Sequence, residues 1–170
     1  IEIGDGCRLD GVSIRIRGDG HRILIGDGCR LGPGTSLWME DADGTLTIGA
    51  KSTFESAHLA VTERGSSISI GADCMFANGI DVRTGDSHAI LSRETGMRLN
   101  SAADVSVGDH VWVAARAMIL KGVAIKSDSV VATGAIVTKS FADPAVIIAG
   151  NPATVVKTGV TWTRERGPSE

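Results

Sequence analysis

The chain contains no tyrosine, and aromatic residues make up only 4% of its 170 residues. A broad core built around large rings is therefore excluded, while 22 glycines indicate a narrow interior with many tight turns. There is no run of about 18 apolar residues, so we expect no membrane-spanning segment. The 17 basic and 20 acidic residues are well mixed, with a net charge of −3 and no basic stripe for nucleic acid or an anionic membrane.

Cysteine is scarce as well. The three cysteines, Cys7, Cys29 and Cys74, form no CxxC pair and are odd in number, which favours reduced, buried thiols in a cytoplasmic protein. The first residues, "IEIGDGCRLDG", have neither the basic start nor the apolar segment of a secretory signal. Because the chain does not begin with methionine, it is open how many residues precede Ile1.

The chain is rich in a six-residue repeat of aliphatic side chains. The repeat is plainest in the second half, at Val107, Val113, Ile119, Ile125, Val131 and Val137. A period of six fits neither an amphipathic helix nor an alternating strand. It fits short strands that meet at corners, with six residues on each side of a triangular coil, 18 residues per coil, and coils stacked at roughly 4.8 Å.

The coil count locates the irregular parts of the repeat. Coil starts fall at residues 3, 25, 48, 70, 107 and 125, in steps of 22, 23, 22, 37 and 18. Every excess over 18 residues falls at one corner, after the third side of the coil. Three of the excesses are short polar segments, and the fourth is an arm, residues 83–104, that opens with "RTGDSHAI" and carries His88. Loops accept length at little cost, so the arm alone indicates no function.

The coil that follows the arm carries a tryptophan, Trp112. It precedes the inward residue of the second side, so we expect it to face outward, where an indole is costly unless it covers a ligand or another subunit. His110 should point to solvent from a corner. The other residues at that corner position are Gly6, Gly28, Lys51, Asp73 and Asp128. The three cysteines recur at one small-residue position, which indicates packing rather than a nucleophile.

The repeat and the ending "GAIVTKSFADPAVIIAGNPATVVK" resemble the hexapeptide-repeat acyltransferases, in which "AGNPA" closes the helix. The order of "RTGDSHAI" and "GDHVWVAA", with His88 and Trp112 separated by 24 residues, resembles the sugar and polysaccharide O-acetyltransferase branch. The departures are Ala114 and Gly85, where the family usually has Gly and polysaccharide enzymes often have Ser.

The resemblance implies an all-β fold, a left-handed parallel β-helix of about seven triangular coils with one long protruding loop. The β-helix domain is expected to cover residues 1–156, with the arm at 83–104 and a short C-terminal tail at 157–170. A homotrimer with active sites between subunits is also implied.

The resemblance further implies direct acetyl transfer from acetyl-CoA to a saccharide hydroxyl, on a surface polysaccharide or its precursor. A hydroxyl is a weak nucleophile, and the pKa of histidine lies near working pH, so His88 is the expected general base. Asp86 is expected either to orient the His88 ring or to be a turn residue. The N–H near Ala115 is the expected oxyanion donor, and Trp112 is expected to serve both catalysis and cofactor binding.

The remaining site residues rest on the resemblance in the same way. Positions that match the family's pantetheine and phosphate contacts are Trp112, Ala115, Thr133, Thr138, Lys139 and Lys157. Lysines meet phosphates as point charges, although such residues are also common at β-helix corners. Candidates for acceptor binding are His58, Asn78 and Arg83, and no metal is expected.

Three other functions stay open. N-acetylation of an amino sugar, often nucleotide-linked, uses the same fold, and the absence of an N-terminal nucleotide-binding domain favours O-acetylation only mildly. A metal hydratase of the γ-carbonic anhydrase type needs two histidines about five residues apart, which positions 21, 58, 88 and 110 do not offer. A non-catalytic β-helical scaffold gives no role to His88 or Trp112.

Overall fold

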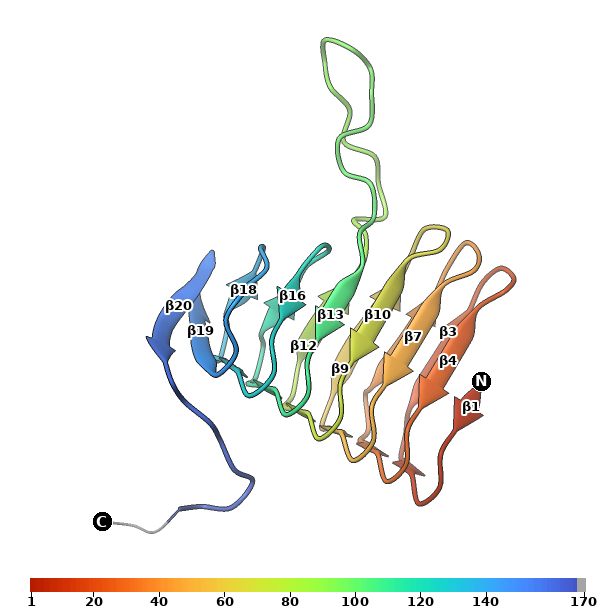
Figure 1. Ribbon diagram of the computed structural model, residues 1–170. Coiled ribbons are helices and arrows are strands. Elements are labelled where there is room, and N and C mark those ends of the chain that lie inside the picture. Colours follow the sequence, from red (N-terminus) through yellow and green to blue (C-terminus); the bar gives the residue numbers. More distant parts are fainter. Residues whose placement is uncertain (168–170) are drawn as a thin grey trace.

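The computed structural model describes residues 1–167, which form a parallel β-helix with one long protruding arm (Figure 1). Sheet A contains β1 (Glu2–Ile3), β4 (Arg22–Ile25), β7 (Thr45–Ile48), β10 (Ser67–Ile70), β13 (Val105–Val107) and β16 (Ala124–Ile125). Sheet B contains β2 (Arg8–Leu9), β5 (Arg30–Leu31), β8 (Thr53–Phe54), β11 (Met75–Phe76), β14 (Trp112–Val113), β17 (Val130–Val131), β19 (Val146–Gly150) and β20 (Ala153–Thr158). Sheet C contains β3 (Ser13–Ile16), β6 (Ser36–Met39), β9 (Ala57–Val61), β12 (Ile80–Arg83), β15 (Met118–Ile119) and β18 (Ile136–Val137).

The coils follow the expected order. Each of six complete coils gives one strand to each sheet, and a seventh is incomplete because only β19 continues the stack, in sheet B. β20 turns back antiparallel to β19 through the segment "GNPA" and closes this end. The all-β parallel β-helix of about seven coils is therefore confirmed, and the domain boundary expected at residue 156 lies inside β20. None of residues 1–167 belongs to a helix long and apolar enough to cross a membrane.

The interior is a single column of aliphatic ladders. Parallel pairing in sheet A stacks the ladder Ile25, Ile48, Ile70, Val107 and Ile125, each at most 3% exposed. In sheet B the inward rings of Phe54 and Phe76 stack with centroids 4.5 Å apart. Full burial of one such side chain stabilises the fold by about 1.5–3 kcal/mol. The six-residue period thus predicts the core because each hexad sends one large side chain inward.

The corners explain the small and turn-forming residues. The corner between sheets A and B has positive φ in every complete coil, at Gly6, Gly28, Lys51, Asp73, His110 and Asp128. Beside it, a Cβ on Gly49 would lie 2.4 Å from the backbone of Gly71 in the next coil, and a Cβ on Gly71 would lie 2.4 Å from Asp109. Only glycine fits where successive coils approach so closely.

The cysteines are packing residues, as their spacing indicates. Cys7, Cys29 and Cys74 are unpaired, and each thiol donates a hydrogen bond to a glycine carbonyl of the adjoining coil, at 3.1–3.2 Å. Burial raises the pKa of Cys74 to about 11. A thiol with that pKa stays protonated near neutral pH, so it supplies no thiolate nucleophile.

The arm leaves β12 at the corner between sheets C and A and returns to β13. Figure 1 shows it rising well beyond the shorter loops that occupy the same corner in the three preceding coils. The extra residues inferred from the coil count therefore all lie along one edge of the triangular prism, the edge between sheets C and A. The arm is the longest of these insertions.

Candidate active site

The base of the arm is fixed by a buried cluster of hydroxyl groups. The Thr84 hydroxyl donates to the carbonyl of Thr62 at 3.0 Å and accepts from the Thr62 N–H at 2.9 Å. The Ser66 hydroxyl lies 3.0 Å from the same Thr84 oxygen and donates to the Thr62 carbonyl at 2.7 Å. Thr84 is completely buried. Because buried polar groups hold their partners tightly, this cluster ties the start of the arm to the preceding coil.

Above the base, a charged network continues the anchoring. Asp86 accepts hydrogen bonds from Lys121 and from the Asn100 side chain, the latter at 2.9 Å. The Asn100 amide also donates to the carbonyl of His88 at 2.8 Å, and its oxygen accepts from the N–H of Ile90 at 2.7 Å. Hydrogen bonds from Lys121 and Asn100 hold the pKa of Asp86 below its ordinary value. The outgoing and returning sides of the arm are thus hydrogen-bonded to each other at the position of His88.

A second charge pair fastens the arm to the neighbouring loop. The guanidinium of Arg98 donates to both carboxylate oxygens of Glu63, with the longer bond at 2.9 Å. This bidentate pair holds the pKa of Glu63 below its ordinary value. The arm is therefore anchored to its own chain at two points near its base.

His88 is exposed, and the structure corrects one expectation about it. Its backbone N–H donates to the Asp86 carbonyl at 2.8 Å in a turn where Ser87 has a φ of 64°. Within residues 1–167 the His88 ring has no hydrogen-bond partner, and Oδ2 of Asp86 accepts from Lys121 and Asn100 instead. Asp86 orients the backbone around His88 rather than its imidazole. Neither Lys121 nor Asn100 was singled out from the sequence.

The far part of the arm exposes four large apolar side chains on either side of a polar turn. The side chains concerned are Ile90 (59% exposed), Leu91 (57%), Met97 (67%) and Leu99 (67%). They lie on a short hairpin in which Leu99 donates its N–H to Ile90 at 2.8 Å and Leu91 bridges Arg98. Four large exposed apolar side chains on one projecting hairpin are typical of an interaction surface.

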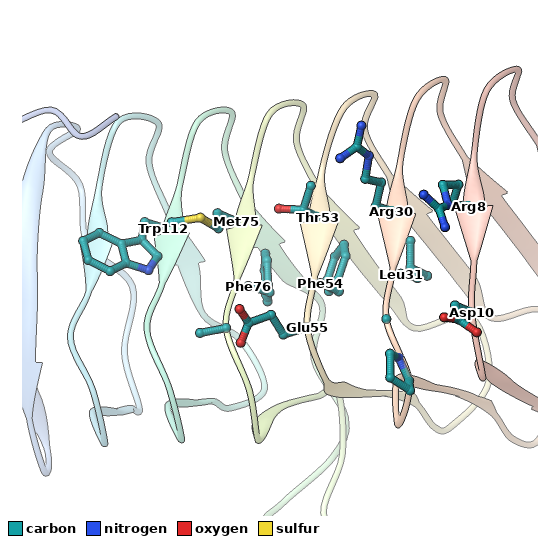
Figure 2. A pocket seen from close by; sticks show the side chains of 13 residues that line it. Arg8, Asp10, Arg30, Leu31, Thr53, Phe54, Glu55, Met75, Phe76 and Trp112 are labelled. Atoms are coloured by element: carbon teal, nitrogen blue, oxygen red, sulfur yellow. The ribbon is translucent and has the colours of Figure 1, made fainter. Parts of the chain in front are cut away.

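Trp112 lies on the outer face of sheet B, as expected, and is half-buried there. The outward residues of successive strands form a row: Arg8, Arg30, Thr53, Met75 and Trp112 (Figure 2). Together with neighbouring side chains they line a groove of about 760 Å³, with Trp112 at one end and the two arginines at the other. The volume is in the range of small-molecule sites.

His110 corrects a second expectation. It does not point to solvent, because Trp162 of the C-terminal segment covers it with ring centroids 4.3 Å apart and planes within 7°. Trp162 is only 8% exposed and also packs against Trp112, with centroids 6.3 Å apart. The segment expected to be a simple tail therefore reaches the face that carries Trp112. A lone tryptophan in the polar stretch "TWTRERG" was the available signal.

One chain does not bring His88 and Trp112 together. The arm leaves the corner between sheets C and A, whereas Trp112 lies on sheet B, the face opposite that corner of the triangular section. The arm also projects away from the coils rather than folding back over sheet B (Figure 1). A site that uses both residues needs a second copy of the chain.

The residues expected to bind the cofactor lie at several places. Ala115 and Thr133 occupy the corner between sheets B and C in successive coils, where the Gly134 N–H donates to the Ala115 carbonyl at 2.9 Å. Thr138 and Lys139 are exposed just after β18, and Lys157 is exposed on β20. The single chain gathers them into no one cluster. Their role stays a prediction.

Two of the residues expected to bind the acceptor share the outer face of sheet C. His58 and Asp81 are register neighbours on β9 and β12, and Asp81 accepts a hydrogen bond of 2.8 Å from Arg83. Asn78 is exposed at the corner where the chain enters sheet C, and its carbonyl accepts from the N–H of Arg116 at 2.9 Å. His58 and Arg83 thus lie below the base of the arm, on a face that also borders Ala115 and Thr133.

Comparison with known proteins agrees with this architecture. A sequence profile described as "Hexapeptide repeat of succinyl-transferase" matches residues 104–139. The solved structure of the polysialic acid O-acetyltransferase OatWY is 37% identical with a TM-score of 0.93, and the match covers 99% of this chain and 78% of that one. The chain belongs to the hexapeptide-repeat family.

Two curated sequences extend the likeness of this hexapeptide-repeat protein. It is 39% identical over 123 residues to the polysialic acid O-acetyltransferase of Neisseria meningitidis, which covers 72% of this chain and 55% of that protein. It is 36% identical over 119 residues to the polysialic acid O-acetyltransferase of Escherichia coli O1:K1 / APEC, which covers 70% of this chain and 38% of that protein. The chain therefore spans about half or less of the length of these curated relatives.

Proposed function

We propose that this protein transfers an acetyl group from acetyl-CoA to a hydroxyl of a polysaccharide or its precursor, with His88 as the general base. The observation that carries the proposal is an exposed histidine on a rigidly anchored arm, one coil before an outward tryptophan. This arrangement occurs in a chain 37% identical to a polysialic acid O-acetyltransferase along 99% of its length. A non-catalytic scaffold would leave the anchored His88 without a role.

The chemistry uses groups that the chain presents. The His88 imidazole takes the proton of the acceptor hydroxyl as its oxygen attacks the thioester carbonyl. The tetrahedral oxyanion then needs a donor, and within residues 1–167 the N–H of Ala115 makes no hydrogen bond. Collapse of the intermediate breaks the carbon–sulfur bond, and the leaving thiolate takes the proton from the His88 imidazolium. The products are the acetyl ester and free CoA, with neutral His88 restored.

The proposal includes a homotrimer in which two subunits form each site. Three observations support it. His88 and Trp112 lie on opposite sides of one chain, four exposed apolar side chains flank the tip of the arm, and the thin prism of one β-helix buries less surface than an assembly would. In this arrangement the arm of one subunit crosses to sheet B of its neighbour. Ala115 and Thr133, at the edge of sheet B, then border the cofactor.

The test is the release of CoA thiol by the purified protein with acetyl-CoA and a panel of acceptors. The panel holds neutral and carboxylated polysaccharides, their monosaccharides, and amino sugars with and without a nucleotide. We expect turnover with a polysaccharide and a product that alkaline hydroxylamine cleaves, because alkaline hydroxylamine cleaves oxygen esters and leaves amides intact. Turnover with amino sugars alone, giving a hydroxylamine-resistant product, would establish N-acetylation instead. No thiol release with any member of the panel would refute the proposal.

A further inference from the structure

The C-terminal segment Val160–Arg164, called the clasp from here on, is bound along its length to the corner between sheets A and B. Val160 donates its N–H to the Ala145 carbonyl at 3.0 Å. The Trp162 indole N–H donates to the His110 carbonyl at 2.8 Å, and the indole face covers the His110 ring. Trp162 is buried within a segment whose neighbours are exposed. The clasp is therefore docked by its one aromatic residue.

Arg164 extends the docking over the two preceding coils. Its guanidinium donates to the Asp73 carboxylate at 3.1 Å, to the Thr53 hydroxyl at 2.8 Å and to the Cys74 carbonyl at 3.1 Å. It also lies 5.6 Å from the centre of the Trp162 ring. Because these partners belong to coils stacked before that of His110, Trp162 and Arg164 together span three successive coils.

The hydrogen bonds of His110 require its charged form. Its Nδ1 lies 2.8 Å from the Asp73 carboxylate, and its Nε2 lies 3.0 Å from the Trp162 carbonyl. Both partners are acceptors, and a neutral imidazole has only one N–H to give them. Only the imidazolium makes both bonds, and its stacking on the indole face is a cation–π contact. Loss of one proton would therefore break one of the two bonds that His110 makes, to Asp73 or to the clasp.

The charged groups around His110 favour the imidazolium. Asp73 faces it from the β10–β11 corner and Asp128 from the β16–β17 corner, while Arg164 of the clasp is the cation that shares the Asp73 carboxylate. Partial burial lowers the pKa of His110, but the hydrogen bonds to Asp73 and to the Trp162 carbonyl outweigh it, and the pKa lies above 6.5.

The clasp touches the proposed site through Trp162. Its ring meets Trp112 at 6.3 Å between centroids and an angle of 49°, whereas Trp112 itself lines the groove of sheet B. Trp162 does not line that groove, so it supports Trp112 from beside it. The docked clasp thus places an indole ring directly beside Trp112.

We propose that Trp162 is a positioning residue that holds Trp112 in place, and that the clasp docks when His110 is protonated and releases when His110 loses its proton. The effect on transfer rests on the proposed function. Docking itself does not, because it is a property of the chain's own contacts.

The pH range in which the clasp docks follows from the pKa shifts of His110 and Asp73. Because the pKa of His110 is raised on folding, its stabilising contribution is complete below the ordinary value of 6.5 and is lost as pH rises through the folded value. Burial raises the pKa of Asp73, but the hydrogen bonds from His110 and Arg164 lower it by more, so the pKa of Asp73 lies below its ordinary value. Its contribution is therefore present above the ordinary value of 3.8 and is lost as pH falls. The clasp is thus most tightly docked between pH 3.8 and pH 6.5.

Docking is measured directly by labelling the protein with 5-fluorotryptophan, since the three tryptophans give three fluorine NMR signals. Trp112→Phe and Trp162→Phe assign them. We expect the Trp112 and Trp162 signals to shift together with one midpoint above pH 6.5, and the Trp38 signal to stay constant. In His110→Asn, which tolerates the φ of 52° at this corner, that midpoint should vanish. A Trp162 signal that does not change with pH, or that changes equally in His110→Asn, would overturn the proposal.

The consequence for transfer is measured from kcat/KM over the same pH range. Trp162→Ala should lower kcat/KM on the order of tenfold, because misplacement of about 1 Å near a reacting centre costs up to ~100-fold. Trp162→Phe keeps an aromatic ring and should recover part of the lost kcat/KM. In wild type kcat/KM should fall at alkaline pH, and this fall should be absent in His110→Asn. Arg164→Ala should weaken docking, whereas Arg166→Ala, two residues along and without a side-chain hydrogen bond within residues 1–167, should not.

The fluorine titration tests the docking of the clasp, and the pH profile of kcat/KM tests its effect on acetyl transfer. A coupled fluorine titration without any acetyl transfer would reject the proposed function and leave the clasp established. Acetyl transfer whose pH profile is the same in wild type and His110→Asn would reject the role of the clasp and leave the function standing.

Discussion

The arm and the clasp are the two large departures from the coil, and they are held in opposite ways. The arm is fixed at its base by buried hydroxyls and charge pairs, and it exposes four apolar side chains on either side of its tip. The clasp has its apolar residue, Trp162, buried against its own coil, and charged groups hold it in place. The arm is thus suited to contact something beyond its own chain, whereas the clasp serves its own chain.

The difference also separates two kinds of contribution to the proposed site. His88 is carried by the arm away from Trp112, so it can act on a neighbouring subunit's Trp112 but not on its own. Trp162 acts on the Trp112 of the same chain. Substitutions in the arm should therefore be severe and should depend on assembly, while substitutions in the clasp should be milder.

The largest expected effect comes from removing the base on the arm. His88→Ala should lower transfer by about 10²–10⁴-fold, the usual contribution of a general base. The rise in Tm caused by acetyl-CoA should stay the same, because His88 is exposed and supports no other part of the fold. The matched control is Arg93→Ala, also exposed on the arm, which should leave both unchanged. A fully active His88→Ala variant would show that the arm takes no part in the transfer reaction.

An intermediate effect is expected where the arm joins the coil. Thr84→Val keeps the shape but leaves the buried N–H of Thr62 without its acceptor, so the free energy of unfolding should fall by about 1–3 kcal/mol. Thr95→Val, in the exposed part of the arm, should change it by less than about 0.5 kcal/mol. Urea denaturation measures both. Equal effects would show that the base of the arm is not specially anchored.

The smallest effect is expected at the charge network below His88. Lys121→Met should let the pKa of Asp86 rise toward its ordinary value of 3.8, because hydrogen bonding to Lys121 is the main cause of its depression. The network stabilises the arm above that value and is lost as pH falls, so the loss should begin at higher pH in Lys121→Met. Loss of the network is measured by hydrogen exchange of the Ile90 amide, whose N–H is bound to Asn100 and should exchange faster once the network is lost. Lys126→Met, an exposed lysine of the next coil, should match wild type.

The fold could be predicted from the sequence because each coil repeats the same local rule. The hexad aliphatics face inward, the corner residues have positive φ, and the excess residues fall at one edge, so Val107, Lys51 and the arm each lie where the period places them. The outward position of Trp112 follows from the same alternation.

The contacts of the site residues could not be predicted in this way, because they join segments far apart in the sequence. Asp86 was expected either to orient His88 or to be a turn residue, and its carboxylate accepts a hydrogen bond from Lys121, 35 residues away. His110 was expected in solvent, but Trp162, 52 residues away, covers it. The period fixes where a residue lies on its own coil. It does not say where a non-repeating segment will return.

The most direct test of the central claim, that two subunits share each site, mixes two damaged proteins. His88→Ala and Trp112→Ala are each expected to be nearly inactive alone. Coexpressed and purified as mixed trimers through two different tags, they should recover about one third of wild-type activity, since every mixed trimer contains one site in which an intact arm meets an intact sheet B. Mixed trimers that stay as inactive as their parents would contradict the shared site. A monomeric wild-type protein that is fully active would contradict it as well.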